Sequence, residues 1–164
     1  MIQNIMVPLA FSRYSQGLLE YAADMATSLG AHLYVVNVIN GRNLEAVELI
    51  NHHGYKVDSE SYTELILEDR RRKMDEMLAP LTLDDEKVTI AFRIGEPADE
   101  LLRFVLEEQI DVVVMGVKTR DIQHMFTGSV AERLFRRCPC TIVSYRDKEI
   151  SQRLKKRIER HLHL

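Results

Sequence analysis

The stretch Asp111-Val112-Val113-Val114-Met115-Gly116 decides the fold. Four apolar residues follow one another without the polar alternation of a half-exposed strand, so the run predicts a short strand buried on both faces. Buried strands of this kind belong to parallel sheets whose faces are covered by helices. The segments on either side of the run are therefore expected to alternate between helix and strand.

The segments around this run fit that expectation. Val88–Ile94 alternates in polarity and predicts a strand, and Gly95-Glu96-Pro97-Ala98 begins a helix with proline in its first turn. A polar loop follows the run from Val117 to Thr127. Gly128-Ser129 then opens a helix that ends near residue 137, and Thr141–Tyr145 forms the last strand.

The N-terminal segment predicts a strand–helix–strand unit. Ile2–Leu9 is a short apolar strand, Ser12 is the expected N-cap of the next helix, and Gly30 is the glycine expected just after the helix end. His32–Ile39 follows at once as the second strand. Such tight joints imply parallel strands with a right-handed crossover.

The segment between the second and third strands is less regular. A short helix is expected over 43–51, and a longer one from Ser61 to Ala79, with a capping box at Ser61-Tyr-Thr-Glu64. Five strands alternating with four main helices predict an α/β fold, with an open, doubly wound parallel sheet that carries helices on both faces.

Length and composition indicate one globular domain. The chain has 164 residues, of which 46% are hydrophobic and 29% charged, and its formal net charge is −3. An acidic balance does not attract nucleic acid. The N-terminus does not resemble a signal peptide, and no segment approaches the roughly 18 apolar residues of a membrane span. We expect a soluble, cytoplasmic protein without a nucleic-acid or membrane partner.

The two cysteines, Cys138 and Cys140, flank Pro139. Two thiols cannot complete a zinc site alone, and so few cysteines fit a reducing compartment. The cysteines are interpreted as packing residues at a helix-to-strand junction, and no metal site is expected.

The C-terminal segment differs in charge from the rest of the chain. Residues 146–164 carry seven Lys or Arg against three Asp or Glu, whereas the remainder carries 15 against 22. Ile150, Leu154, Ile158 and Leu162 step by four and predict one helical stripe. Residues 147–164 thus form a basic amphipathic helix or tail. It packs on the acidic body or across a dimer, or it docks on a protein partner or an anionic surface.

An ordered set of short motifs resembles the universal stress protein family. The set comprises Gly95-Glu96-Pro97-Ala98, Met115-Gly116, Gly128-Ser129-Val130 and Cys138-Pro139-Cys140. The likeness covers residues 1–146, which makes 147–164 an extension of the family domain. It implies a sheet of order 3-2-1-4-5 and a homodimer in which the fifth strands pair. Such pairing would cover an apolar sheet edge that is otherwise an association hazard.

In this strand order the chain reverses direction between strands one and four, and ligands of open α/β sheets bind at that point. The resemblance further implies an adenine nucleotide there, ATP or AMP with Mg. The residues expected to bind it are Pro8, Leu9, Ala10, Val38, Met115, Gly116, Lys118, Thr119, Arg120, Gly128, Ser129 and Val130.

The nucleotide motif is partly degraded. Binding members of the family resemble G-x2-G-x9-G-[S/T], but Thr119 stands at the second glycine, and only eight residues separate it from Gly128. Ala10 replaces the acidic residue typical of binders after the first strand. Lys118 and Arg120 could neutralise phosphates, or could belong to a solvated loop. Ser129 begins a capping box, which is compatible with a phosphate nearby.

Two functions follow from these features. The first is a dimeric stress-response or signalling module that senses an adenine nucleotide. The alternative is a protein–protein interaction module that binds no nucleotide and works through its dimer and its C-terminal tail. No P-loop, His–carboxylate pair or metal cluster marks a catalytic centre, so we do not expect an enzyme, although slow ATPase activity stays open.

Overall fold

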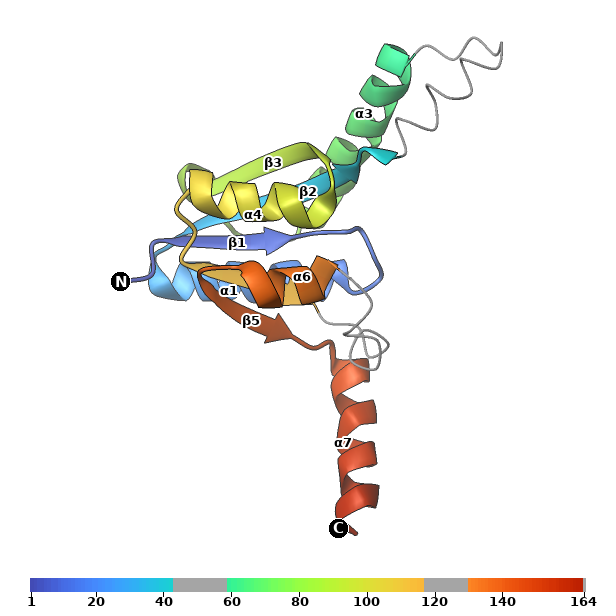
Figure 1. Ribbon diagram of the computed structural model, residues 1–164. Helices are drawn as coiled ribbons and strands as arrows, with labels where there is room; N and C mark the ends of the chain where they lie inside the picture. Colours follow the sequence, from blue (N-terminus) through green and yellow to red (C-terminus); the bar gives the residue numbers. More distant parts are fainter. Residues whose placement is uncertain (43–58, 117–129, 164) are drawn as a thin grey trace, which may run out of the picture.

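Figure 1 shows the computed structural model, which describes residues 1–42, 59–116 and 130–163. The strands are β1 (Asn4–Pro8), β2 (His32–Asn40), β3 (Val88–Gly95), β4 (Val112–Gly116) and β5 (Thr141–Tyr145). The helices are α1 (Ser15–Leu29), α3 (Ser59–Leu78), the short 3-10 helix η1 (Asp85–Lys87), α4 (Pro97–Glu107), α6 (Val130–Arg137) and α7 (Lys148–Leu162).

The five strands form one parallel sheet in the order β3-β2-β1-β4-β5. β1 pairs with β2 from Asn4 opposite His32, and with β4 from Ile5 opposite Val112. The fold class and the strand order are both confirmed. Strand boundaries differ from the sequence prediction by one or two residues, except for β5, which matches it.

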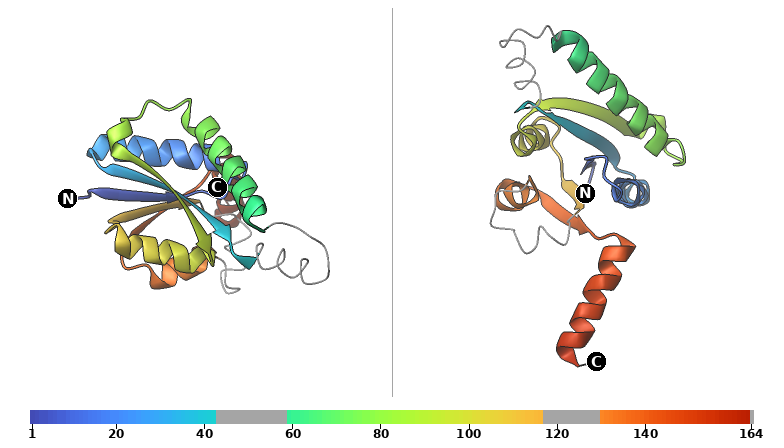
Figure 2. Two further views of the ribbon diagram at one scale, coloured as in Figure 1. Left: turned by 90° about the horizontal axis from the view of Figure 1, so that it is seen from above. Right: turned by 90° about the vertical axis from the view of Figure 1, so that its right-hand side faces the viewer.

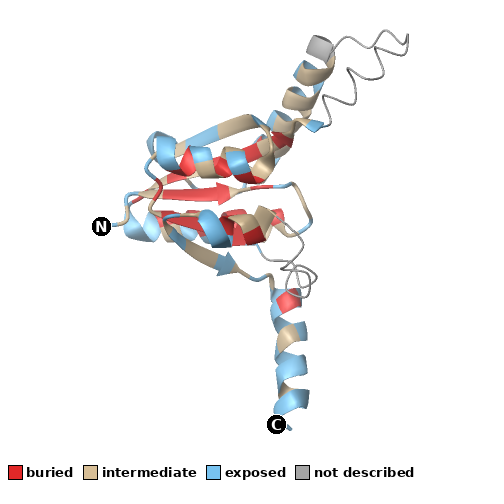
Figure 3. Ribbon diagram, in the orientation of Figure 1, coloured by how far each residue is buried: buried red, intermediate tan, exposed pale blue. Residues whose placement is uncertain are grey.

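Helices cover both faces of the sheet (Figure 2). On one face α1 and α3 bury a cluster that includes Leu19, Val35 and Met74, each with no solvent exposure. On the other face α4 and α6 bury a second cluster around Met6 and Val113. The central strands are therefore buried from both sides, as Figure 3 shows for β1. The run at 112–115 is fully buried, as its composition predicted.

The limits of α1 illustrate which local signals hold. Gly30 adopts the left-handed conformation at φ 65°, and its N–H bonds Ala26 O and Thr27 O, as expected for a glycine that ends a helix. Ser12 is not the N-cap, because the helix begins at Ser15 and Tyr14 occupies the cap. The Ser15 hydroxyl instead accepts a bond from the Ser12 N–H, so the two serines stabilise a turn before the helix.

The prediction for α3 is wrong at its start. The helix already includes Ser59 and Glu60, so Ser61 lies inside it and cannot be the N-cap. A capping box is a local signal, and a helix passes through it when the preceding residues are also helical. The helix predicted over 43–51 lies outside the described residues.

The last helix, α7, leaves the compact body, as Figure 1 shows. Its first turn is held by the body, because Ile150 is only 3% exposed, whereas Ile158 and Leu162 are 55% and 56% exposed. Among the helices of residues 1–42, 59–116 and 130–163, each is too short or too polar to cross a bilayer.

Candidate functional site

A cavity of about 330 Å³ opens at the carboxyl ends of β1, β2 and β4. At this point, between β1 and β4, the order in which strands are added to the sheet reverses, and such a point is the usual ligand position of open α/β sheets. Aliphatic side chains dominate its wall. The lining residues are Pro8, Leu9, Ala10, Ser12, Tyr14, Ser15, Leu18, Val36, Val38, Pro97, Leu101, Met115, Gly116, Val130, Ala131, Tyr145, Asp147 and Ile150.

The cavity brings together every described residue that the sequence assigned to the site. These seven are Pro8, Leu9, Ala10, Val38, Met115, Gly116 and Val130. The other five, Lys118, Thr119, Arg120, Gly128 and Ser129, lie outside the described residues. That any of them binds a nucleotide stays a prediction.

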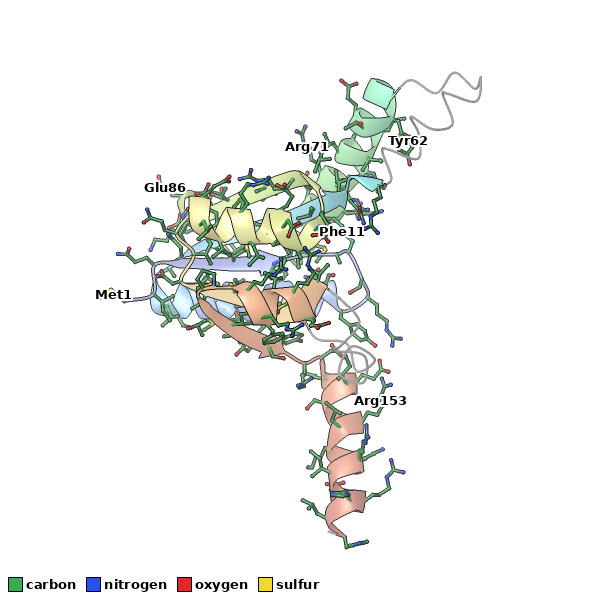
Figure 4. The ribbon with its side chains drawn as sticks, in the orientation of Figure 1. Met1, Phe11, Tyr62, Arg71, Glu86 and Arg153 are labelled. Atoms are coloured by element: carbon green, nitrogen blue, oxygen red, sulfur yellow. The ribbon has the colours of Figure 1, made fainter. Side chains whose placement is uncertain are left out.

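The segment after β1 forms the floor of the cavity and is fixed by the neighbouring strand. The Leu9 N–H donates to Val36 O at 2.8 Å, which extends the β1–β2 ladder by one residue. The Asn37 amide Nδ2 donates to Leu9 O at 2.7 Å. Phe11 then takes a positive φ of 51° and turns the chain towards α1; Figure 4 labels this residue. The backbone of residues 8–10 is therefore held in one place.

Asn37 is buried with one polar atom unused. The residue is 2% exposed, and its Oδ1 has no hydrogen-bond partner within the described part of the chain. Alternation along β2 places this side chain on the sheet face opposite to Val36 and Val38, which line the cavity. Asn37 thus supports the floor from behind through its bond to Leu9.

Four helices begin around the cavity, since each follows a parallel strand. The helices α1, α4, α6 and α7 contribute Ser15, Pro97, Val130 and Ile150 to the wall from their first turns. Helix N-termini carry a partial positive charge and unpaired N–H groups, which favour a bound anion.

α6 is fixed against α4 by a forked ion pair. Arg133 places one guanidinium nitrogen 2.7 Å from Glu96 and the other 2.7 Å from Asp99, at the start of α4. The two helix N-termini are thereby held in register beside the cavity.

Gly116 ends β4 at the cavity wall. A Cβ placed there would lie 3.6 Å from Leu18 Cδ2, which is ordinary van der Waals contact. Packing of the described residues does not require glycine at this position. Its absence of a side chain therefore leaves room at the site rather than in the core.

The sequence patterns did not indicate one part of the wall, which comes from the C-terminal segment. Tyr145, Asp147 and Ile150 all line the cavity. A Cβ at Gly17 would lie 2.6 Å from Tyr145 Oη, so the glycine in α1 makes room for this ring. Gly17 within a helical pattern, and the first residue of the apolar stripe, were the signals that could have indicated this contact.

The polar groups of the wall come from two places, the segment around the start of α1 and the C-terminal segment. Ser12, Tyr14 and Ser15 add hydroxyl groups, and Asp147 is the one charged lining residue in the described ranges. Burial, together with the nearby carboxylate of Asp147, raises the pKa of Tyr145 above its ordinary value. The phenol is therefore neutral and available to donate a hydrogen bond at neutral pH.

The described residues hold no group of three or more His, Cys, Asp or Glu side chains arranged for a metal ion. Cys138 and Cys140 are free thiols whose sulfurs lie 3.3 Å apart, packed against the α4–α6 cluster. Burial raises the pKa of the Cys140 thiol to about 12. This thiol is thus protonated at neutral pH and is a poor nucleophile.

Comparisons with known proteins agree with this architecture. The model of the universal stress protein family matches residues 1–146. A universal stress protein of Methanothermobacter thermautotrophicus is 26% identical over 156 residues, covering 87% of this chain and 94% of its own.

Two solved structures share the fold. A universal stress protein from Archaeoglobus fulgidus in complex with dAMP superposes with a TM-score of 0.58 at 19% identity, covering 89% of this chain and 100% of its own. A universal stress protein in complex with cAMP superposes with a TM-score of 0.57 at 18% identity, with coverages of 88% and 96%.

Proposed function

This chain belongs to the universal stress protein family, and from that premise we propose that its carboxyl-end cavity binds an adenine nucleotide, ATP or AMP. The observation that carries the proposal is the cavity itself. It lies at the carboxyl ends of the neighbouring strands β1 and β4, and the seven described residues of the expected site line it. The volume, about 330 Å³, is within the range of small-molecule sites.

The two ends of a nucleotide need different surroundings, and the wall offers both. Val36, Val38 and Leu101 provide an apolar surface for the flat base. The first turns of α1 and α6 provide positive dipole ends for phosphate groups, whereas the start of α4 is already capped by the Glu96 carboxylate. Nucleotides found in two proteins of the same fold, dAMP in one and cAMP in the other, support the same ligand class here.

The sequence departures predict a modest affinity. Thr119 adds a Cβ where the family motif has glycine, and Ala10 offers no side-chain acceptor. Ala10 is exposed and borders the cavity, so its methyl group leaves that part of the wall without a hydrogen bond to the ligand. Lys118 and Arg120 are proposed to offset the negative charge of the phosphate groups, in AMP as well as in Mg-bound ATP.

We further propose that the protein acts as a cytoplasmic stress-response module, not as an enzyme. Residues 1–146 form the nucleotide-sensing domain and pair as a homodimer through β5, and residues 147–164 form an extension. The alternative, an interaction module without nucleotide, is favoured by one observation: Ile158 and Leu162 of α7 are more than half exposed.

The test is native mass spectrometry of the freshly purified protein, followed by calorimetric titration with AMP and Mg-ATP. A variant that fills the cavity is Ala10→Trp, chosen because Ala10 is exposed and its replacement does not disturb the core. The matched control is Ala79→Trp, which adds the same side chain at an exposed position outside the cavity.

We expect nucleotide binding in the parent chain and in Ala10→Trp at least about tenfold weaker affinity, with Ala79→Trp unchanged. An unliganded chain that ignores millimolar nucleotide would reject the proposal and favour the interaction module. Equal affinity in all three proteins would place the ligand outside this cavity.

A further inference from the structure

α7 extends beyond the β5 edge of the sheet. β5 is the last strand of the sheet, with β4 on one side. Figure 1 and the right-hand view of Figure 2 both show α7 continuing past β5, away from the other strands. Only Arg146 and Asp147 separate the strand from the helix. α7 thus points to the side on which another strand would add to β5.

The base of α7 is anchored, so this direction is set by the chain's own body. Ile150 is buried in the cavity wall, and the Asp147 carboxylate caps the helix by accepting from the Glu149 N–H at 2.9 Å. Glu149 also lies 3.7 Å from the guanidinium of Arg13, in the loop before α1. The rest of the helix, Ser151–Leu162, is here called the arm.

The arm carries an apolar stripe that the body does not cover. Leu154 is half-buried, and Ile158 and Leu162 are 55% and 56% exposed. Arg153, labelled in Figure 4, is exposed beside the stripe. A helix of 15 residues is marginal in water unless an apolar face is packed. A surface that covers the stripe would therefore stabilise the helix.

Charge indicates what kind of surface covers it. Residues 146–164 have an excess of four positive charges, whereas residues 1–145 have an excess of seven negative charges. A second copy of this chain supplies an acidic body. If it adds to the sheet through its own β5, its strands lie beside the first sheet, where the arm extends. At about 1.5 Å per residue the 15-residue helix is about 22 Å long. This length equals four or five times the distance between neighbouring strands of a sheet, so the helix can reach across the strands of a second copy.

We propose that the arm packs its stripe, Leu154, Ile158 and Leu162, against the body of a second copy. The inference rests on the dimer of the proposed function and adds to it a second contact beyond the strand pairing. A two-fold axis makes the exchange reciprocal, so each copy gives one arm and receives one. The arms add apolar area to the pairing of β5, a strand of only five residues.

The first test measures the dimer dissociation constant of the full chain by sedimentation. Ile158→Glu with Leu162→Glu places charge on the stripe without touching the core. The matched control is Leu106→Glu, since Leu106 is a 69% exposed leucine on α4. We expect about tenfold or more weakening in the double variant and no change in the control. A dimer equally stable in all three proteins would overturn the proposed contact between the arm and the second copy.

The second test locates the contact. A photoreactive amino acid at position 158 is expected to cross-link two copies into a covalent dimer on irradiation, whereas the same group at position 106 does not. A monomeric parent chain would overturn the dimer of the proposed function together with the arm. A dimeric parent without a cross-linked dimer from position 158 would overturn the arm alone and leave the stripe to a different partner. Nucleotide binding is measured separately and does not enter either result.

Discussion

The amino ends and the carboxyl ends of the strands differ in their polar contacts. At the amino ends, which we call the closed edge (a row of strand ends, not an outer strand), polar groups pair with one another. The Asp111 carboxylate accepts the N–H groups of Gln3 and Asn4 at 2.7 and 2.9 Å. The Asn4 amide donates to Glu108 O at 3.0 Å and so ties β1 to the end of α4.

At the carboxyl ends, which we call the open edge, the same strands surround a cavity, and Asn37 keeps an unpaired oxygen behind its floor. The closed edge contributes to stability alone, whereas the open edge combines the proposed ligand-binding wall with a buried support, Asn37, that also contributes to stability. Substitutions at the closed edge should therefore change stability alone, and those on the cavity wall should change affinity alone.

Asn37→Asp is expected to have the largest effect. Asn37 is buried and donates to Leu9 O, so an aspartate would lose that bond and face a carbonyl with a buried charge. We expect a loss of about 3 kcal/mol or more in the free energy of unfolding at pH 7. Urea denaturation measures it.

Asn37→Leu is the control for shape, since it removes the unpaired oxygen together with the donor. Its cost should stay below about 2 kcal/mol. Equal losses in the two variants would mean that the lost hydrogen bond to Leu9 O, not the buried charge, decides the cost.

Asn4→Ala tests the closed edge. The variant leaves the carbonyls of Glu108 and Gln109 without the amide that bonds them at 3.0 and 3.3 Å. We expect a loss of about 1–2 kcal/mol by urea denaturation, with nucleotide affinity unchanged. A fall in affinity would show that the two edges are coupled.

The pH dependence of stability tests whether the Asp111 carboxylate stabilises the fold. Two backbone N–H bonds, from Gln3 and Asn4, hold the pKa of its carboxyl below the ordinary value. Its stabilising contribution is thus complete above the pKa of the unfolded chain, about 3.9, and is lost as the pH falls through the lower folded pKa. Thermal melts in this acidic range should show a smaller decline for Asp111→Asn than for the parent. Parallel curves would contradict the role of Asp111.

Gly116→Ala is expected to leave stability within about 0.5 kcal/mol, because its Cβ makes only ordinary contact with Leu18. The added methyl group occupies the cavity wall, so AMP affinity should fall in calorimetric titration. A large stability loss with unchanged affinity would reverse the assignment of this glycine.

The fold could be predicted from short, buried patterns. The 112–115 run, the alternation of strands and helices and Gly30 each depend on neighbours close in sequence, and all hold in the structure. Ser12 and Ser61 were wrong as N-caps, because a cap signal does not determine where a helix starts when other residues can also begin it.

The site was predicted only in part, for a physical reason. Pro8–Ala10, Val38 and Gly116 lie at or near the carboxyl ends of strands, and parallel strands end on the same side of the sheet, so the topology brings them together. Tyr145, Asp147 and Ile150 reach the cavity only because the chain turns after β5 and Gly17 admits the tyrosine ring. Such a contact joins residues more than 120 positions apart and leaves no local pattern.

The most direct test is methyl NMR of the protein titrated with AMP. We expect shifts for the methyl groups of Ala10, Val38 and Met115 at the open edge. We expect none for Ala31 and Ile110, which are buried beside the amino ends of β2 and β4. Shifts at Ala31 or Ile110, or no shifts at the open edge with millimolar AMP, would contradict the claim that the cavity is the nucleotide site.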